Sequence, residues 1–255
     1  MATTVATGET GLYLDLLKKT LTNMIYGDTP QPTFFAANQG YDEVKRANGL
    51  DWPSVAHTMV GRKRLDNLQH CVEAVLDDGV AGDFIEAGVW RGGASILVRG
   101  VLKARGVTDR DVWLADSFQG MPVVESDGHP VDHQMGLHRA NNVLAVDLDT
   151  VKANFARYDL LDERVRFLPG WFRDTLPDAP VEKLAVLRLD GDLHESVMDG
   201  LVHLYPKLCV GGFVIIDDYV HGPCAEAVHE YRDRHGITDP IEDIDGVGAF
   251  WRRTG

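Results

Sequence analysis

Acidic residues end two apolar segments of this sequence, and their positions suggest metal chemistry. Asp190 and Asp192 follow one segment, and Asp217 and Asp218 follow the other. If the two segments are neighbouring strands of a parallel sheet, Asp190, Asp217 and Asp218 lie within reach of one point. Such carboxylates would repel one another, so a hard divalent cation, Mg²⁺ above all, is the economical explanation. The alternative is that these residues only cap helices or form turns.

A glycine-rich stretch at residues 83–95 predicts a ligand-binding turn between a strand and a helix. Residues 83–87 have the pattern of a short strand, and a helix is expected from Ala94 onward. The glycines have the spacing Gly-x-x-x-Gly-Gly, and Glu86 precedes the first of them. An acid here repels a pyrophosphate but suits the ammonium and sulfonium of S-adenosylmethionine, so the stretch favours that ligand over NAD. A tight turn that binds nothing is the alternative.

Two later segments offer contacts for the nucleoside part of such a ligand. Asp116 ends an apolar segment, and an acid at this place can accept both hydroxyls of a ribose in NAD or in S-adenosylmethionine. Trp171 and Phe172 follow Gly170 at the end of the next apolar segment, where an adenine could stack on them. Aromatic side chains that only cover the edge of the sheet are the alternative.

These residues must be positioned by strands that end at one edge of a sheet. From residue 83 onward strand and helix patterns alternate, as in a parallel sheet with helices on both faces. The expected strands are 83–87, 112–116, 165–169, 184–190, 212–217, 240–245 and 247–252, and the expected helices are 94–104, 149–158, 194–208 and 223–235. Asp245 and Gly246 predict a hairpin between the last two strands. The predicted fold class is therefore α/β, a doubly wound seven-stranded sheet whose last strand is antiparallel, as in a class I methyltransferase.

An N-terminal helical extension and cap is expected over residues 1–80, ahead of a Rossmann-like core over residues 81–255. The spacing of apolar residues predicts one helix from Leu12 to about Ile25. A second helix is expected from near Pro53 to Gly79, because proline suits the first turn of a helix.

Within the core, the polar segment 120–146 shows no periodicity and is expected to be a mobile lid over the acceptor. Its histidines could suggest zinc, but Pro130 would break the helix that aligns His129 with His133. A solvated lid is the preferred interpretation.

Composition narrows the class of protein and of partner. The formal net charge of -14 argues against a nucleic-acid partner, since phosphates are held by excess Lys and Arg. Three cysteines without metal-type spacing fit a reducing compartment. Apolar runs are too short to cross a bilayer. We therefore expect a cytoplasmic protein with no membrane partner.

Five blocks of the sequence together resemble the macrocin O-methyltransferase family, which includes mycinamicin and noviose sugar methyltransferases of antibiotic biosynthesis. The blocks are residues 83–94 (D-F-I-E-A-G-V-W-R-G-G-A), 113–120 (W-L-A-D-S-F-Q-G), 166–175 (R-F-L-P-G-W-F-R-D-T), 187–192 (L-R-L-D-G-D) and 215–219 (I-I-D-D-Y). The resemblance runs from about Leu12 to Arg253. The segment 190–196 is more similar to the noviose branch than to the macrolide branch, although His194 stands where Tyr is often found.

The resemblance implies Mg²⁺-dependent transfer of a methyl group from S-adenosylmethionine to a hydroxyl of a deoxysugar on a natural product, by a homodimer. Asp190, Asp217 and Asp218 would hold the metal, and Asp192 would be the general base. The donor would be bound by Thr58, Met59, Glu86, Ala87, Gly88, Val89, Trp90, Arg91, Gly92, Gly93, Ala94, Asp116, Ser117, Gln119, Gly170, Trp171 and Phe172.

Two rival functions stay open at this point. A catechol-type methyltransferase would use the same metal cluster on a phenolic acceptor, which ionises more readily than a sugar hydroxyl. A binding module would keep the fold with a decayed site, but the intact acids argue against this reading. His57, His194 and His221 are alternatives to Asp192 as the base.

Overall fold

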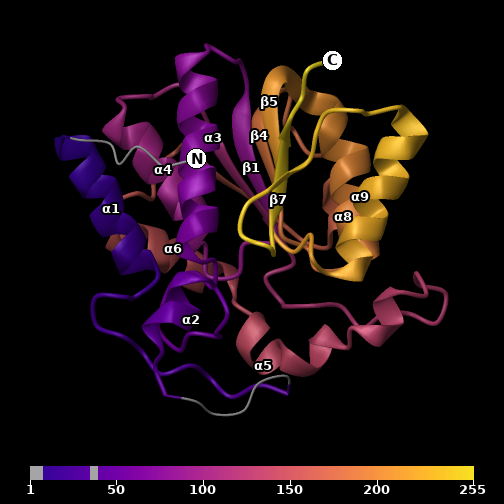
Figure 1. Cartoon of the computed structure of the whole chain (residues 1–255), viewed down its shortest axis with the longest axis horizontal. Helices are drawn as coiled ribbons and strands as arrows, with labels where there is room; N and C mark the ends of the chain where they lie inside the picture. Colours follow the sequence, from indigo (N-terminus) through magenta and orange to yellow (C-terminus); the bar gives the residue numbers. More distant parts are fainter. Residues whose placement is uncertain (1–7, 35–39) are drawn as a thin grey trace.

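A seven-stranded sheet lies at the centre of the computed structural model, which describes residues 8–34 and 40–255 (Figure 1). The strands are β1 (Asp83–Ala87), β2 (Val112–Asp116), β3 (Val165–Pro169), β4 (Leu184–Leu189), β5 (Leu208–Ile216), β6 (Glu242–Asp243) and β7 (Ala249–Arg252). Their order across the sheet is β3-β2-β1-β4-β5-β7-β6. β7 is antiparallel to β5 and β6, and the other neighbouring strands are parallel. The predicted seven-stranded sheet with an antiparallel last strand is confirmed.

Helices cover both faces of this sheet. They are α1 (Glu9–Leu21), α2 (Glu43–Ala47), α3 (Arg62–Asp77), α4 (Gly93–Ala104), α5 (Asn141–Leu144), α6 (Leu148–Arg157), α7 (Phe172–Thr175), α8 (His194–Leu204) and α9 (Gly222–His235), with short 3₁₀ turns η1 (Asp132–Gln134), η2 (Leu137–Ala140) and η3 (Tyr205–Lys207). In Figure 1, α1, α3, α4 and α6 lie on one face of the sheet, and α8 and α9 lie on the other.

Alternation along the strands builds a separate core on each face. Phe84 and Leu114 pack into the cluster formed with α1, α3, α4 and α6, whereas Ile85 and Ala115 pack into the cluster formed with α8 and α9. Successive side chains of a strand point to opposite faces, so a strand covered on both faces has to be apolar throughout. This is why the central strands appear as mostly apolar runs in the sequence, interrupted by Glu86 in β1 and Arg188 in β4.

Several predicted boundaries are wrong, mostly at the N-terminal end. The first helix begins at Glu9 and ends at Leu21, and the second begins at Arg62 instead of near Pro53. Residues 53–61 cannot be helical because distant groups hold their backbone: the His57 N–H donates to the Leu21 carbonyl, and Arg91 donates to the carbonyl oxygens of Pro53 and Ala56. Long-range hydrogen bonds therefore override a local proline signal here.

Smaller corrections concern the core. The strand expected at 240–245 is reduced to the two residues of β6, and the helix expected at 194–208 ends at Leu204 and continues as η3. The segment 120–146 contains η1, η2 and α5 and lies beneath the sheet in Figure 1. α3 packs into the same core cluster as α4, and the division of the chain at residue 80 stays a prediction. Residues 1–7 and 35–39 of the predicted extension lie outside the described residues.

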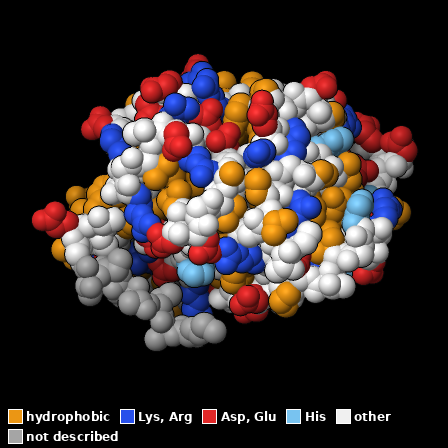
Figure 2. All heavy atoms as spheres, turned by 90° about the horizontal axis from the view of Figure 1, so that it is seen from above, with side chains coloured by type: hydrophobic (Ala, Val, Ile, Leu, Met, Phe, Trp, Pro, Cys, Tyr) orange, Lys and Arg blue, Asp and Glu red, His pale blue; other side chains and the backbone are white. Residues whose placement is uncertain are grey.

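Figure 2 shows the molecule from above, and on this face acidic, basic and apolar side chains are interspersed. In the described part of the chain, each helix is too short or too polar to span a membrane.

Candidate active site

The glycine turn after β1 brings the ends of β1 and β4 into close contact. Gly88 has a positive φ of 91°, and a side chain at this position would place its Cβ 1.9 Å from the carbonyl oxygen of Asp190. Gly92, the N-cap residue of α4, is also left-handed, with a φ of 84°. Only glycine allows both the conformation and the approach, so the turn holds the first acid of the predicted metal site against the predicted donor site.

We expect Gly88→Ala to lower the free energy of unfolding by about 1–3 kcal/mol or more and to weaken donor binding, because the new methyl group would overlap the backbone of β4. Urea unfolding and calorimetry with S-adenosylmethionine measure the two effects. Gly246→Ala is the matched control, since Gly246 has a similar φ of 84° but open space around its Cβ position. Equal losses in both variants would show that backbone strain, and not the close approach, makes glycine necessary.

The predicted metal residues gather beside two buried arginines. One carboxylate oxygen each from Asp190, Asp217 and Asp218 lies within 4.8 Å of the others. Asp217 accepts hydrogen bonds from Arg188 Nη2 at 2.6 Å and from Arg64 Nη1 at 2.5 Å, and Asp190 accepts one from Arg188 Nη1 at 2.8 Å. Each carboxylate oxygen has two lone pairs, so an oxygen that accepts one such bond can still bind a cation.

Burial and repulsion from neighbouring acids disfavour the charged forms of Asp192, Asp217 and Asp218. Burial raises the pKa of Asp218 well above its usual value, and the charges of Asp192, Asp190 and Asp217 add to the effect. Burial also raises the pKa of Asp192 to about 7, with the charge of Asp190 as the next cause. For Asp217, burial raises the pKa while Arg188 opposes the shift. Carboxylates that converge and repel one another in this way fit a divalent cation with oxygen ligands.

A second set of donors overlaps the first. Asp192, Asp218 and His221 also bring one ligand atom each within 4.8 Å of one another. The structure thus leaves Asp192 with two conceivable roles, as a base next to a metal or as one of its ligands. His57 is a weaker candidate base, since burial lowers its pKa to about 4 and its Nδ1 lies 2.7 Å from the Tyr158 hydroxyl. His194 Nε2 lies 3.1 Å from Glu230, which places this ring toward α9.

Glu86 has a different environment from the one expected of a donor ligand. Its carboxylate accepts hydrogen bonds from Ser95 Oγ and from Arg188 Nη1, the latter at 2.8 Å, and the side chain is buried. Burial raises its pKa to about 7, against the opposing charge of Arg188. Arg188 therefore joins Glu86, Asp190 and Asp217, so the two predicted binding regions share one buried cation. Sequence reasoning missed this role, although a lone arginine inside the apolar segment 184–189 signals a buried acidic partner.

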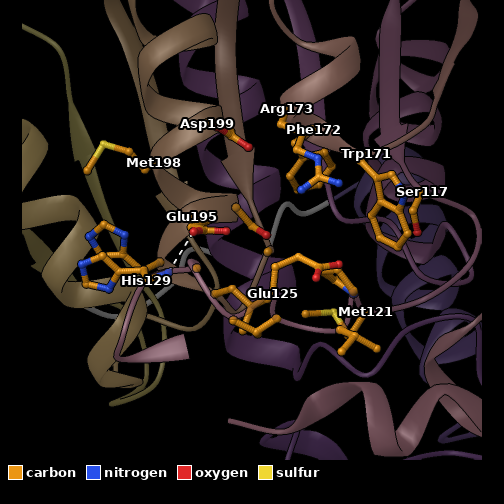
Figure 3. A pocket seen from close by; sticks show the side chains of 18 of the residues that line it. Ser117, Met121, Glu125, His129, Trp171, Phe172, Arg173, Glu195, Met198 and Asp199 are labelled. Carbon is orange, nitrogen blue, oxygen red and sulfur yellow. Dashed lines mark hydrogen bonds between the residues drawn. The ribbon is translucent and has the colours of Figure 1, made fainter. Parts of the chain in front are cut away.

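A cavity of about 690 Å³ lies at the carboxyl edge of the sheet, between the lid segment and the first turns of α7 and α8. In Figure 3, Ser117 and Trp171 lie at one end of it and His129 and Met198 at the other. Its wall consists of residues Gly88, Asp116, Ser117, Gly120, Met121, Pro122, Val123, Val124, Glu125, Asp127, Gly128, His129, Pro130, Trp171, Phe172, Arg173, Asp190, Gly191, Leu193, His194, Glu195, Ser196, Met198 and Asp199. Because Gly88 and Asp190 both belong to the wall, the cavity reaches the glycine turn and the edge of the acidic cluster.

The predicted donor residues fall into two groups. Gly88, Asp116, Ser117, Trp171 and Phe172 line the cavity. The rest lie outside its wall, and they are Thr58, Met59, Glu86, Ala87, Val89, Trp90, Arg91, Gly92, Gly93, Ala94, Gln119 and Gly170. The segment that carries Thr58 and Met59 nevertheless lies on the glycine turn, since the Gly93 N–H donates to the His57 carbonyl at 3.0 Å.

Asp116 is held in place by the backbone around it. Its Oδ2 accepts a hydrogen bond from the Val89 N–H and its Oδ1 accepts one from the Phe118 N–H, each at 2.7 Å. The Ser117 hydroxyl also donates to Oδ1, at 3.5 Å. Burial raises the pKa of Asp116. A fixed carboxylate at the cavity wall fits the ribose contact predicted for it, and the donor assignments stay predictions.

Comparison with known proteins identifies a family whose members resemble this chain. Residues 10–253 match the sequence model described as Macrocin-O-methyltransferase (TylF). The chain is 63% identical, over 95% of its length and 93% of the relative, to the 8-demethyl-8-(2,3-dimethoxy-alpha-L-rhamnosyl)-tetracenomycin-C 4'-O-methyltransferase of Streptomyces olivaceus. It is 58% identical, over 95% of its length and 96% of the relative, to the Mycinamicin III 3''-O-methyltransferase of Micromonospora griseorubida. The solved structure of the O-methyltransferase NovP is similar at a TM-score of 0.92 and 54% identity, covering 97% of this chain and 100% of that one.

Proposed function

The chain belongs to the macrocin O-methyltransferase (TylF) family, and on that premise we propose that it methylates a hydroxyl of a deoxysugar on a natural product, with S-adenosylmethionine as donor and Mg²⁺ as cofactor. The observation that carries the proposal is the cavity whose wall contains both Gly88 of the glycine turn and Asp190 of the acidic cluster. A donor methyl group and an acceptor hydroxyl can meet only where two such regions share one space. The names of the relatives above state a 4'-O-methyltransferase of a rhamnosyl-tetracenomycin C and a 3''-O-methyltransferase of mycinamicin III, and the rhamnosyl group in the first name supports the acceptor class.

In this proposal the donor binds along the wall formed by Asp116, Ser117, Trp171 and Phe172. Asp116 accepts hydrogen bonds from the ribose, and the two aromatic side chains pack on the adenine. When bound, S-adenosylmethionine would supply the methyl group. The buried Arg188 keeps Glu86 and Asp190 at fixed positions on either side of the glycine turn.

Asp190, Asp217 and Asp218 would hold Mg²⁺, since their oxygens already converge and repel one another. When bound, Mg²⁺ would supply positive charge that lowers the pKa of the acceptor hydroxyl. Asp192 takes the proton of that hydroxyl, because it is the partly buried carboxylate two residues beyond Asp190 that does not belong to the first ligand set. Arg64 and Arg188 donate hydrogen bonds to Asp217 and hold it in this orientation.

The assembly and location predicted from the resemblance remain proposals too. α1 presents Leu12 and Leu16 to solvent at 74% and 56% exposure, and an apolar surface of this kind supports the expected homodimer. A cytoplasmic enzyme that acts without membrane or nucleic acid is consistent with the polar, net acidic chain.

The test is a methyl-transfer screen with isotopically labelled S-adenosylmethionine, read by mass spectrometry. We expect label on glycosylated natural products that carry a free deoxysugar hydroxyl, in the presence of Mg²⁺, and none after chelation. Catechols are the comparison set, because they represent the alternative of a phenolic acceptor. Label on catechols alone would replace the sugar proposal by the catechol-type one, and label in excess chelator would contradict the role of the metal.

A further inference from the structure

The lid segment supplies a helix cap that α8 lacks. The first turn of a helix leaves backbone N–H groups without partners, and a side-chain oxygen at the N-cap residue normally accepts from them. The N-cap residue of α8 is Leu193, whose side chain has no oxygen. Asp132, which is only 1% exposed, takes this place from 62 residues earlier: its Oδ1 accepts from the His194 N–H at 2.7 Å and its Oδ2 from the Glu195 N–H at 3.1 Å.

Two further contacts join the lid to the same turn. The His129 N–H donates to Glu195 Oε1 at 2.9 Å, as drawn in Figure 3. The rings of His129 and His194 stack with their centroids 3.7 Å apart and their planes 7° from parallel. His129, His194 and Glu230 form a cluster of metal-ligating types. Imidazole lone pairs lie in the ring plane, and two nearly parallel, stacked planes share no point, so this cluster is a packing contact between the lid and α8.

The turn that receives the lid also carries the predicted base. Asp192 has a left-handed φ of 59°, and the Leu193 N–H closes the turn by donating to the Gly191 carbonyl at 2.6 Å. On the far side, Cys224 Sγ donates to the Asp192 carbonyl at 3.1 Å. Asp192 is therefore only two residues before His194, the first residue whose N–H donates to Asp132.

We propose that Asp132 is a positioning residue that couples docking of the lid to placement of the Asp192 carboxylate. The proposal rests on the function proposed above in giving Asp192 a role in turnover. When the lid is docked, it closes the cavity, and the Asp132 carboxylate fixes the first turn of α8. When the lid is undocked, the N–H groups of His194 and Glu195 lose their acceptor, and the turn that contains Asp192 is free to move.

Comparing Asp132→Ala with Asp132→Asn distinguishes the capping hydrogen bonds of Asp132 from the space that its side chain fills. Asn caps a helix about as well as Asp, and Ala does not. In Asp132→Ala we expect amide exchange in residues 120–130 to become about fivefold to tenfold faster. We expect kcat to fall about tenfold to a hundredfold, because a small displacement of a reacting group has effects of that size. Donor affinity by calorimetry should stay unchanged. Asp132→Asn has a single amide oxygen that can accept from one of the two N–H groups, so it should restore exchange and kcat in part.

Asp147→Ala is the matched control, since Asp147 caps α6 on the other face of the sheet by accepting from the Thr150 N–H. It should cost similar stability without changing kcat. An Asp132→Ala enzyme with kcat no lower than that of Asp147→Ala, or an Asp132→Asn enzyme as slow as Asp132→Ala, would overturn the proposal.

Hydrogen exchange on the unaltered protein gives a test that needs neither a folded variant nor activity. The amides of His194 and Glu195 should exchange at the same rate as those of residues 120–130 and respond equally to urea, because lid opening frees both. Much slower exchange at His194 and Glu195 than in the lid would overturn the coupling. If the enzyme methylates no acceptor in the screen but the two regions exchange together, the function proposed above fails and the lid contact stands.

Discussion

Asp192→Asn is expected to lower kcat by about two to four orders of magnitude, the usual contribution of a positioned general base. Asn matches Asp in shape and tolerates the left-handed φ of 59° at this position better than most residues, so the turn should keep its conformation. An amide accepts no proton from the acceptor hydroxyl. Donor affinity and metal affinity should therefore remain while turnover is lost.

The measurement is single-turnover methyl transfer, with calorimetry for donor and Mg²⁺. Asp159→Asn is the control, because Asp159 also has a left-handed φ, 54°, but lies away from the cavity after α6. Loss of metal binding in Asp192→Asn would make Asp192 a ligand together with Asp218 and His221, the second set of converging donors. Nearly unchanged turnover would mean that another group takes the proton.

The sheet could be predicted because its signals are local and repeated. Strands such as β1, β2 and β4 are buried on both faces, so each one is a mostly apolar run of the right length. The helices between them show the spacing of an amphipathic surface. The end of each run then fixes where acids such as Asp190 and Asp217 come together. Parallel strands place their carboxyl ends at one edge, and this rule needs no knowledge of side-chain contacts.

The errors arose where distant groups decide the local structure. Pro53 suggests the start of a helix, but residues 53–57 are held by Arg91 and by the carbonyl of Leu21. Arg64 could not be placed in the acidic cluster from sequence, because it reaches Asp217 from α3, 153 residues earlier in the chain. The cap that Asp132 provides for α8 likewise comes from a distant part of the chain. The only sign of this cap in the sequence is that the residue before the helix, Leu193, is not one of the usual capping residues Ser, Thr, Asp or Asn.

Asp218→Asn is expected to stabilise the protein in the absence of metal and to abolish its response to Mg²⁺. Asp218 lies beside Asp190, Asp192 and Asp217, and desolvation together with the charges of these neighbours raises its pKa. Removing one acid relieves this repulsion, which should raise the free energy of unfolding by about 1 kcal/mol in chelator. The same change replaces one charged carboxylate ligand of the predicted cation by a neutral amide oxygen, which binds Mg²⁺ more weakly, so kcat should fall by about two or more orders of magnitude.

Thermal unfolding with increasing Mg²⁺ measures both effects, since a ligand that binds only the folded state raises the melting temperature with its concentration. The unaltered protein should show this rise and Asp218→Asn should not. Equal activity of the unaltered protein in Mg²⁺ and in excess chelator would remove the metal from the reaction altogether.

Asp217→Asn is the informative contrast, because Asp217 serves two buried arginines as well as the predicted metal. Its replacement leaves Arg64 and Arg188 short of a buried negative charge, which costs about 3–5 kcal/mol when one partner of a buried pair is removed. We therefore expect this variant to be less stable than the unaltered protein with or without Mg²⁺. If Asp218→Asn stabilises the protein and Asp217→Asn destabilises it, the two acids differ in role. Asp218 then lacks a cationic partner without metal, whereas Asp217 is already paired with Arg64 and Arg188.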